Sequence, residues 1–142
     1  MSKRLLRNQR GAALLETAIT IPLVLLIAVS IFEFGRAYQT WQVMTNAARE
    51  GARIAILADK TDTDVQNTVR DYMKNGGLPM YGSASVTIER TVPIGASTAS
   101  RITIGYPFQF MVLNGVIRLV TPKSTTGSPL TMQSVALMRN EG

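Results

Sequence analysis

The chain has 142 residues, of which 46% are hydrophobic and none is cysteine or histidine. This length allows one small domain besides a membrane anchor, and the two missing residue types exclude disulfide bonds, thiol nucleophiles, zinc sites built on Cys or His, and Ser-His-Asp triads. The formal net charge is +6, but four of the 15 Lys and Arg precede residue 11. Without these four, 11 cations stand against 9 Asp and Glu, a net charge of only +2. The charge therefore indicates no nucleic-acid partner.

The first 34 residues combine a basic segment with a long apolar run. Gly11 follows the basic segment, and the run from Ala12 to Phe34 is interrupted near its start only by Glu16. A carboxylate in a membrane-spanning segment costs about 3 kcal/mol at the bilayer centre and less near an interface, so Glu16 needs a specific role. Because positive charge beside a first apolar segment stays in the cytoplasm, we expect the residues after Phe34 on the opposite side, which is the periplasm if the cell has two membranes. The four cations are Lys3, Arg4, Arg7 and Arg10.

This order of features resembles the leader of a type IV prepilin. In that family a membrane aspartyl peptidase cuts after the glycine, and the glutamate becomes the fifth residue of the mature protein. The resemblance implies a leader at residues 1–11 and cleavage between Gly11 and Ala12. Glycine suits such a cut because it resists helix formation and lets the backbone extend into a protease. The Glu16 carboxylate, one helical turn from the new amino group, can then pair with an amine of its own chain or of a neighbour.

Two other interpretations of the N-terminal segment stay open. It can be a secretory signal cleaved near Ser30, or a membrane anchor that is never cleaved. The apolar run continues past Ser30, and the apolar part of a signal rarely carries a glutamate. These two observations favour the prepilin interpretation.

The helical period continues beyond the apolar run. We expect one helix from about Ala12 to Ala58, roughly 70 Å long, with residues 12–34 as its transmembrane half and residues 35–142 as a periplasmic α+β domain. Pro22 and Gly35 are the two positions where the helix should kink or hinge. The pattern places Phe34, Trp41 and Ala48 near one face, Tyr38, Thr45 and Ala52 beside it, and Tyr38 and Trp41 at the membrane interface.

Small residues line one side of the second half of this helix. Alanine or glycine recurs every four residues between positions 47 and 55, so that the backbone of a partner can approach closely. Packing against a sheet of the same domain is favoured over a subunit interface. Two arginines four residues apart form a separate stripe. The residues of this packing or interface region are Ala47, Ala48, Arg49, Gly51, Ala52, Arg53 and Ala55.

Together these features resemble the TadE-like minor pilins, or pseudopilins, of tight-adherence (Tad, Flp-type) pilus systems. The resemblance rests on Arg10-Gly11, Glu16, Pro22 and the block from Ala47 to Arg53, and it covers about the first 58 residues. Many major pilins have phenylalanine where this chain has Ala12. Cleavage should survive that difference, whereas the methylation of the new amine known in the wider family is less certain.

The resemblance implies a set of partners and a location. The partners are a prepilin peptidase, a major Flp-type pilin, a sister minor pilin, and the platform proteins and secretion ATPase of the pilus machine. The chain would cross the inner membrane once, with its N-terminus in the cytoplasm, and would support pilus assembly and surface adhesion. The alternative function is that of an uncleaved, membrane-anchored periplasmic adhesin or scaffold domain.

The residues after Ala58 predict a loop, a short helix and a sheet. Thr63 and Gln66 form a possible capping box after a loop over Asp59–Thr63, and Gly76 ends the helix. Its buried face should hold Val65, Val69, Tyr72 and Met73.

Three segments have strand character. Ser85–Val92 and Arg101–Phe108 alternate apolar and polar residues on either side of a turn or loop at positions 93–100, and Pro107 suggests a strand end. Leu130–Arg139 should be the last strand, after a polar loop at positions 123–129. The apolar segment Phe108–Val120 between them favours a short helix or loop over the sheet.

The expected fold is therefore α+β, with a long N-terminal helix packed on a small antiparallel sheet of three or four strands. The sequence has no Gly-rich phosphate loop, no metal-ligand cluster and no nucleophile elbow. We expect no catalytic residues, no cofactor and no enzymatic activity. An enzyme would need several of the acids to gather in one substrate pocket.

Overall fold

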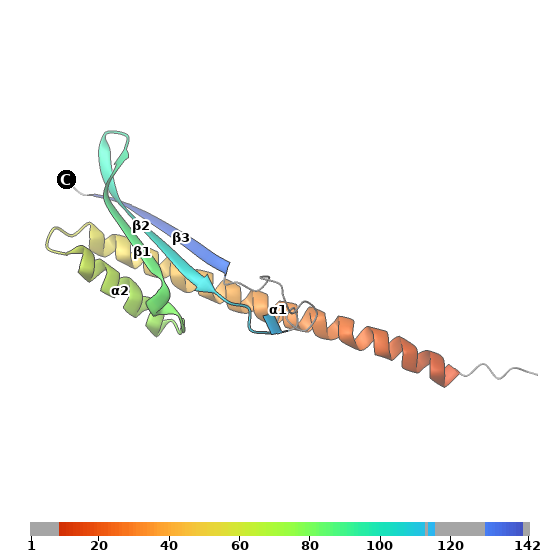
Figure 1. Cartoon of the computed structure of the whole chain (residues 1–142). Helices are drawn as coiled ribbons and strands as arrows, with labels where there is room; N and C mark the ends of the chain where they lie inside the picture. The colour runs from red at the N-terminus through yellow and green to blue at the C-terminus, as the bar shows by residue number, and fades with distance from the viewer. Residues whose placement is uncertain (1–8, 113, 116–129, 141–142) are drawn as a thin grey trace, which may run out of the picture.

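A computed structural model describes residues 9–112, 114–115 and 130–140 of the chain. The fold is α+β, as the sequence predicts: a long helix projects as a rod, and a second helix and a three-stranded sheet cover its C-terminal half (Figure 1). The elements are α1 (Gln9–Ala55), α2 (Asp62–Asn75), the 3₁₀ turn η1 (Tyr81–Ser83), β1 (Ser85–Ile94), β2 (Ser97–Phe108) and β3 (Leu130–Arg139).

Helix α1 is a single continuous helix, but its predicted bounds are wrong at both ends. It is already helical at Gln9 rather than from Ala12, and it ends at Ala55 rather than Ala58. The helix continues through Pro22 and Gly35, and Figure 1 shows no sharp bend at either, although a kink was expected. Pro22 removes one amide donor from the helix, a loss that long apolar helices tolerate better than soluble ones.

The two halves of α1 have different surroundings. Side chains from Gly11 to Ile27 are exposed along the rod, whereas a stripe of the second half is buried under the domain. Ala48 lies in that stripe, but Phe34 and Trp41, predicted near the same face, are 68% and 44% exposed. The domain packs on the row with the smallest side chains, which leaves no room there for large aromatic rings. The buried stripe consists of Glu33, Thr40, Met44, Ala47, Ala48, Gly51, Ala52 and Ala55.

Helix α2 begins earlier than the sequence indicated. The capping box uses Thr61 and Asp64, not Thr63 and Gln66: the Asp64 amide donates to Thr61 Oγ1 at 3.2 Å, and the Thr61 amide donates to Asp64 Oδ2 at 2.9 Å. Thr61 rather than Thr63 is the N-cap because the first turn after Thr61 contains Asp62 and Asp64, whose negative charges are favourable near a helix N-terminus. Thr63 therefore lies inside that turn. Gly76 is the C-cap, as predicted.

The buried face of α2 is largely the predicted one. Val65, Val69 and Met73 are fully buried, but Tyr72 is 40% exposed. These three residues meet the small-residue side of α1 and the inner face of the sheet in one core. Helix α2 and the small sheet thus share one apolar core with the second half of α1.

The sheet is an antiparallel meander in the order β1-β2-β3. Ile102 of the central strand pairs with Ile88 on one side and Ala136 on the other, which fixes the apolar side chains on one face. Strands β2 and β3 cover α1, whereas β1 lies next to α2 (Figure 1). The turn or loop predicted at positions 93–100 is a tight hairpin turn in which Gly95 takes a positive φ of 57°, and it is shorter than predicted because β1 continues to Ile94 and β2 begins at Ser97.

All three predicted strands are present. Pro107 lies where β2 extends beyond its last pair with β1, Ser85↔Gly105, and pairs there with β3 alone, so the lost amide donor is tolerated. Part of the following segment is described: Val112, Asn114 and Gly115 are helical, in agreement with the predicted short helix or loop. Phe108 ends β2, and Gln109, Phe110 and Met111 are described as irregular structure, whereas residues 113 and 116–120, the loop at 123–129 and residues 1–8 of the predicted leader lie outside the described residues.

Candidate functional site: the exposed half of the long helix

The first half of α1 is an apolar surface that no described part of this chain covers. An 18-residue window within it has a mean hydropathy of 2.3 and is 0% buried, and by length and composition α1 can cross a membrane. Residues 12–34 would extend about 35 Å as a helix, which exceeds the roughly 30 Å hydrocarbon core of a bilayer. Each Leu or Ile left in water forfeits about 1.5–3 kcal/mol. This surface therefore requires lipid or other apolar helices around it.

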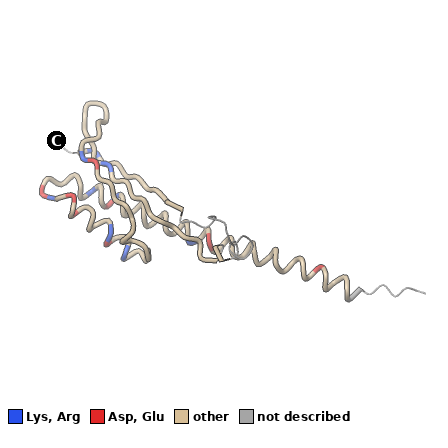
Figure 2. The backbone as a smooth tube through the Cα atoms, viewed as in Figure 1, with Lys and Arg blue, Asp and Glu red and all other residues tan. Residues whose placement is uncertain are grey.

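Glu16 is the one acidic residue on this rod before Glu33 (Figure 2). It is exposed, and among the described residues no cation forms an ion pair with it. Its carbonyl accepts a hydrogen bond from Thr20 Oγ1 at 2.8 Å, which is an ordinary contact within a helix. Its carboxylate is consequently available to a cation from outside the described residues, at a position where lipid would otherwise surround it.

Gly11 and Ala12 lie one turn before Glu16 and inside α1. The backbone at Gly11 is therefore helical in this structure. A protease that cuts between the two residues must first unwind this turn, and glycine lowers the cost because it is about 1 kcal/mol less favourable than alanine within a helix.

The small residues of the second half are occupied within the domain. The row of Ala47, Ala48, Gly51, Ala52 and Ala55 is buried against α2 and the sheet. A Cβ on Gly51 would lie 2.5 Å from Val69 Cγ2 and 3.5 Å from Ile102 Cγ2. Only glycine permits this close approach.

The two arginines beside this row face outward. Arg49 is exposed, and Arg53 Nη2 lies 2.6 Å from Glu50 Oε1 with its side chain 57% exposed. The hydrogen bond from Arg53 lowers the pKa of Glu50. The pair is a surface ion pair between neighbouring turns, and such pairs contribute little to stability.

The sequence analysis missed Glu33 as a structural residue. Its side chain is fully buried although it belongs to the apolar run: Oε2 accepts from Arg36 Nη1 at 2.8 Å, and Oε1 accepts from the Val112 amide at 2.5 Å. Arg36 also lies over the Phe108 ring, 5.4 Å from its centroid. An acid followed three residues later by arginine was the available sequence signal, but the partner at Val112 is too distant in sequence to predict.

Arg90 was missed for the same reason. Its guanidinium donates to the carbonyls of Ala55 and Lys60 at 2.8 and 2.9 Å and to Asp62 Oδ1 at 2.7 Å. It joins the C-terminus of α1 to the N-terminus of α2 from the middle of β1. Asn140 completes the cluster by donating to the Arg90 carbonyl at 2.8 Å.

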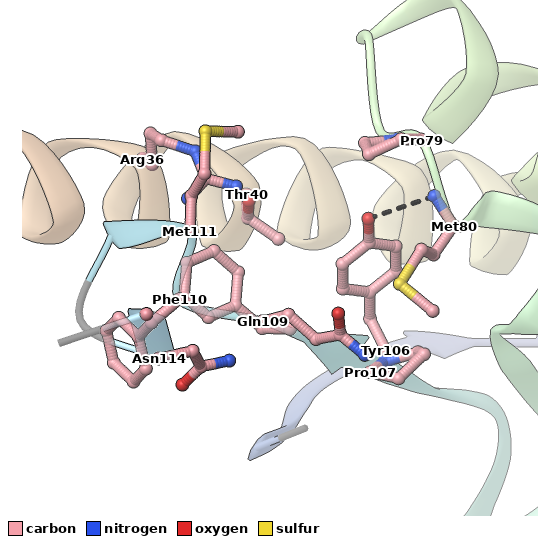
Figure 3. Close-up of a pocket in the computed structure, with 12 residues that line it drawn as sticks. Arg36, Thr40, Pro79, Met80, Tyr106, Pro107, Gln109, Phe110, Met111 and Asn114 are labelled. Carbon is pink, nitrogen blue, oxygen red and sulfur yellow. Dashed lines mark hydrogen bonds between the residues drawn. The ribbon is translucent and has the colours of Figure 1, made fainter. Parts of the chain in front are cut away.

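A pocket opens between α1 and the segment that follows β2. Arg36 and Thr40 of α1 form one wall, and residues 106–111 form the other (Figure 3). The Tyr106 hydroxyl accepts from the Met80 amide at 3.2 Å at its far end. Within the described ranges, no group of three or more His, Cys, Asp or Glu could hold a metal ion.

Comparison with known proteins gives one finding. Residues 11–53 match the family model described as TadE-like protein. No curated protein and no solved structure matches the chain. The matched residues are most of α1, including Gly11, Glu16 and the buried small-residue row except Ala55, and they stop before α2 and the sheet. The similarity to the TadE-like family therefore covers the exposed rod and the start of the domain core.

Proposed function

We propose that this chain is a minor pilin, or pseudopilin, of a Tad (Flp-type) pilus system. A peptidase removes residues 1–11, residues 12–34 hold the subunit in the inner membrane, and residues 35–142 form a domain on the periplasmic side. The subunit then supports assembly of a pilus and adhesion to surfaces. The observation that carries this proposal is an exposed apolar rod with a lone carboxylate five residues after Gly11, in a segment that matches the TadE-like family.

The apolar surface of the rod supports a role in assembly rather than in catalysis. Moving an apolar helix from lipid into a bundle of similar helices exchanges one apolar environment for another, so that packing and polar contacts select the neighbour. Glu16 is the polar group suited to that selection, because its carboxylate has no ion pair among the described residues. Its partner is the new amino group at Ala12, of the same chain or of an adjacent subunit.

The partners follow from the family. We propose that the prepilin peptidase, the platform proteins and the secretion ATPase act on the subunit in the inner membrane. A major Flp-type pilin and a sister minor pilin contact the rod. We assign no catalytic residue and no cofactor to the domain.

Mass spectrometry of the protein from its native membrane tests the leader. The expected mature chain begins at Ala12. A Gly11→Leu variant should retain the leader, whereas Gly35→Leu, the same change at another exposed glycine of α1, should be processed like the parent. Gly35 is a suitable control because nothing lies within 4 Å of a Cβ built there.

Three other results would contradict the proposal. A parent chain that keeps its leader indicates a tethered periplasmic adhesin or scaffold. A chain that begins after Ser30 indicates an ordinary secretory signal. Equal processing of Gly11→Leu and the parent would show that the peptidase does not read this glycine.

A further inference from the structure

The segment after β2 is fastened to α1 where the apolar rod meets the domain. The Val112 amide donates to the buried Glu33 carboxylate, and the Phe110 ring packs edge-on against Phe108 with centroids 5.3 Å apart. Figure 3 shows the segment from Tyr106 to Met111 lying along α1 beside Arg36 and Thr40. Its position along the helix axis is therefore fixed by side chains and not by the chain ends alone.

The depth of this segment follows from the direction of the Glu33 side chain. Side chains on an α-helix point back toward its N-terminus, so that the Glu33 carboxylate covers the turn before its own Cα. The Val112 amide thus lies at the level of Glu33 and the turn before it, at the C-terminal end of the apolar run, and Met111 lies beside Arg36 (Figure 3). Because lipid surrounds a single membrane helix on every side, the level along the axis decides what a side chain meets.

The exposed surface at this level is apolar. Met111 is 67% exposed and Val112 is 37% exposed, and in the last turn of the apolar run Ile31 is 69% and Phe34 is 68% exposed. No charged residue occurs between positions 17 and 32. Glu33 has no exposed surface, and the guanidinium of Arg36 is held against it. The apolar surface of the rod therefore continues, without an exposed acid, onto the segment after β2.

We propose that residues 109–112, which we name the interfacial turn, insert into the lipid surface on the domain side of the membrane. The occupant of this apolar surface is phospholipid, at the boundary of headgroups and acyl chains. The buried pairing of Glu33 with Arg36 and with the Val112 amide removes a carboxylate from lipid and holds the turn at that depth. Glu33 is thus a positioning residue.

The inference rests on the anchoring of residues 12–34 in a membrane, as proposed above, but not on leader cleavage or on a pilus. Its consequence is a second attachment. The rod alone would let the domain rotate and tilt about one helix, whereas the rod together with the interfacial turn fixes the face that the domain presents to its neighbours.

The natural absence of cysteine permits a direct test. Single-cysteine variants of the full chain, Met111→Cys, Phe34→Cys and Val135→Cys, carry an environment-sensitive fluorophore in vesicles of phosphatidylethanolamine and phosphatidylglycerol. Lipids with a nitroxide near the carbonyl end of one acyl chain serve as quencher. Val135 is the matched control, because it is apolar and 56% exposed but lies on the sheet.

We expect several-fold stronger quenching at positions 111 and 34 than at position 135. The quenching at each position should not change when the ratio of protein to lipid is lowered. Quenching at position 34 but not at 111 overturns the inference while leaving the membrane anchor intact. Loss of quenching at position 34 would instead contradict the anchor itself. A signal at 111 that appears only at high protein density indicates contact with a neighbouring subunit and also overturns the inference.

A second variant tests the positioning role. Glu33→Ala removes the acceptor of the Val112 amide. When it is combined with Met111→Cys, quenching at position 111 should fall several-fold. When it is combined with Phe34→Cys, quenching at position 34 should be unchanged. Circular dichroism shows whether the variant folds. A folded Glu33→Ala protein with undiminished quenching at 111 would show that the carboxylate does not hold the turn.

Discussion

At the scale of single residues, Gly51 sets how closely α1, α2 and the sheet pack. A methyl group there would lie 2.5 Å from Val69 Cγ2, so Gly51→Ala should destabilise the domain by about 1–3 kcal/mol through overpacking. Gly35→Ala is the matched change at an open position of the same helix and should stabilise it by about 0.5–1 kcal/mol. Thermal unfolding of the full chain in detergent, followed by circular dichroism, measures both. Equal midpoints for the two variants would contradict this account of the core.

Asp64 gives the α2 cap a pH dependence. The backbone amide and the hydroxyl of Thr61 donate to its carboxylate and lower its pKa from the ordinary 3.8. A lowered pKa in the folded state means that the contribution to stability is complete above the unfolded value and is lost as the pH falls through the folded value. The stability difference between the parent and Asp64→Asn should thus be constant from pH 5 to 8 and shrink below pH 4. Denaturant titrations across this range measure it, and a difference that grows in acid would refute the cap.

At the scale of elements, Arg90 connects the ends of two helices through β1. In Arg90→Met the side chain keeps its apolar stem but leaves the carbonyls of Ala55 and Lys60 without their donors, and the expected loss is about 1–3 kcal/mol. Arg101→Met is the matched control on β2, because the exposed Glu89 is the one acid that Arg101 pairs with in the described part of the chain, and this pair should contribute under about 1 kcal/mol. Urea unfolding of the two variants compares them. A loss at Arg101 as large as that at Arg90 would contradict the assigned role.

The elements also show how far sequence reasoning reaches. Periodicity predicted both helices and all three strands, because each pattern is local and repeats several times within its element. It misplaced the α2 cap by two residues, since Thr61 and Thr63 both have suitable neighbours. The contacts of Glu33 with Val112 and of Arg90 with Ala55 were beyond prediction, because each joins residues far apart in the sequence. The spacing of Gly11, Glu16 and the small residues can be recognised from the sequence because all of these residues belong to one helix.

At the scale of the whole molecule, the two halves of α1 have different roles. The second half of α1 is buried by its own domain through small residues, and the first half is left bare. A folded domain that covers only half of a helix presents the other half to lipid or to other subunits. Stability and assembly can therefore be perturbed separately, which makes the role of Glu16 testable.

Under the proposed function, Glu16→Gln should be inserted, processed at Gly11 and folded like the parent, but it should be lost from assemblies with the major pilin. The reason is that glutamine keeps the size of the side chain and removes the charge that pairs with the amine of Ala12. Glu50→Gln is the matched control, because it neutralises an acid of the same helix whose partner, Arg53, lies within the domain. Co-purification with the major pilin from cross-linked membranes, together with the mass of the mature chain, measures assembly and processing at once. If Glu16→Gln is cleaved and co-purifies as well as Glu50→Gln does, the carboxylate does not select the neighbour, and packing of the apolar rod alone must do so.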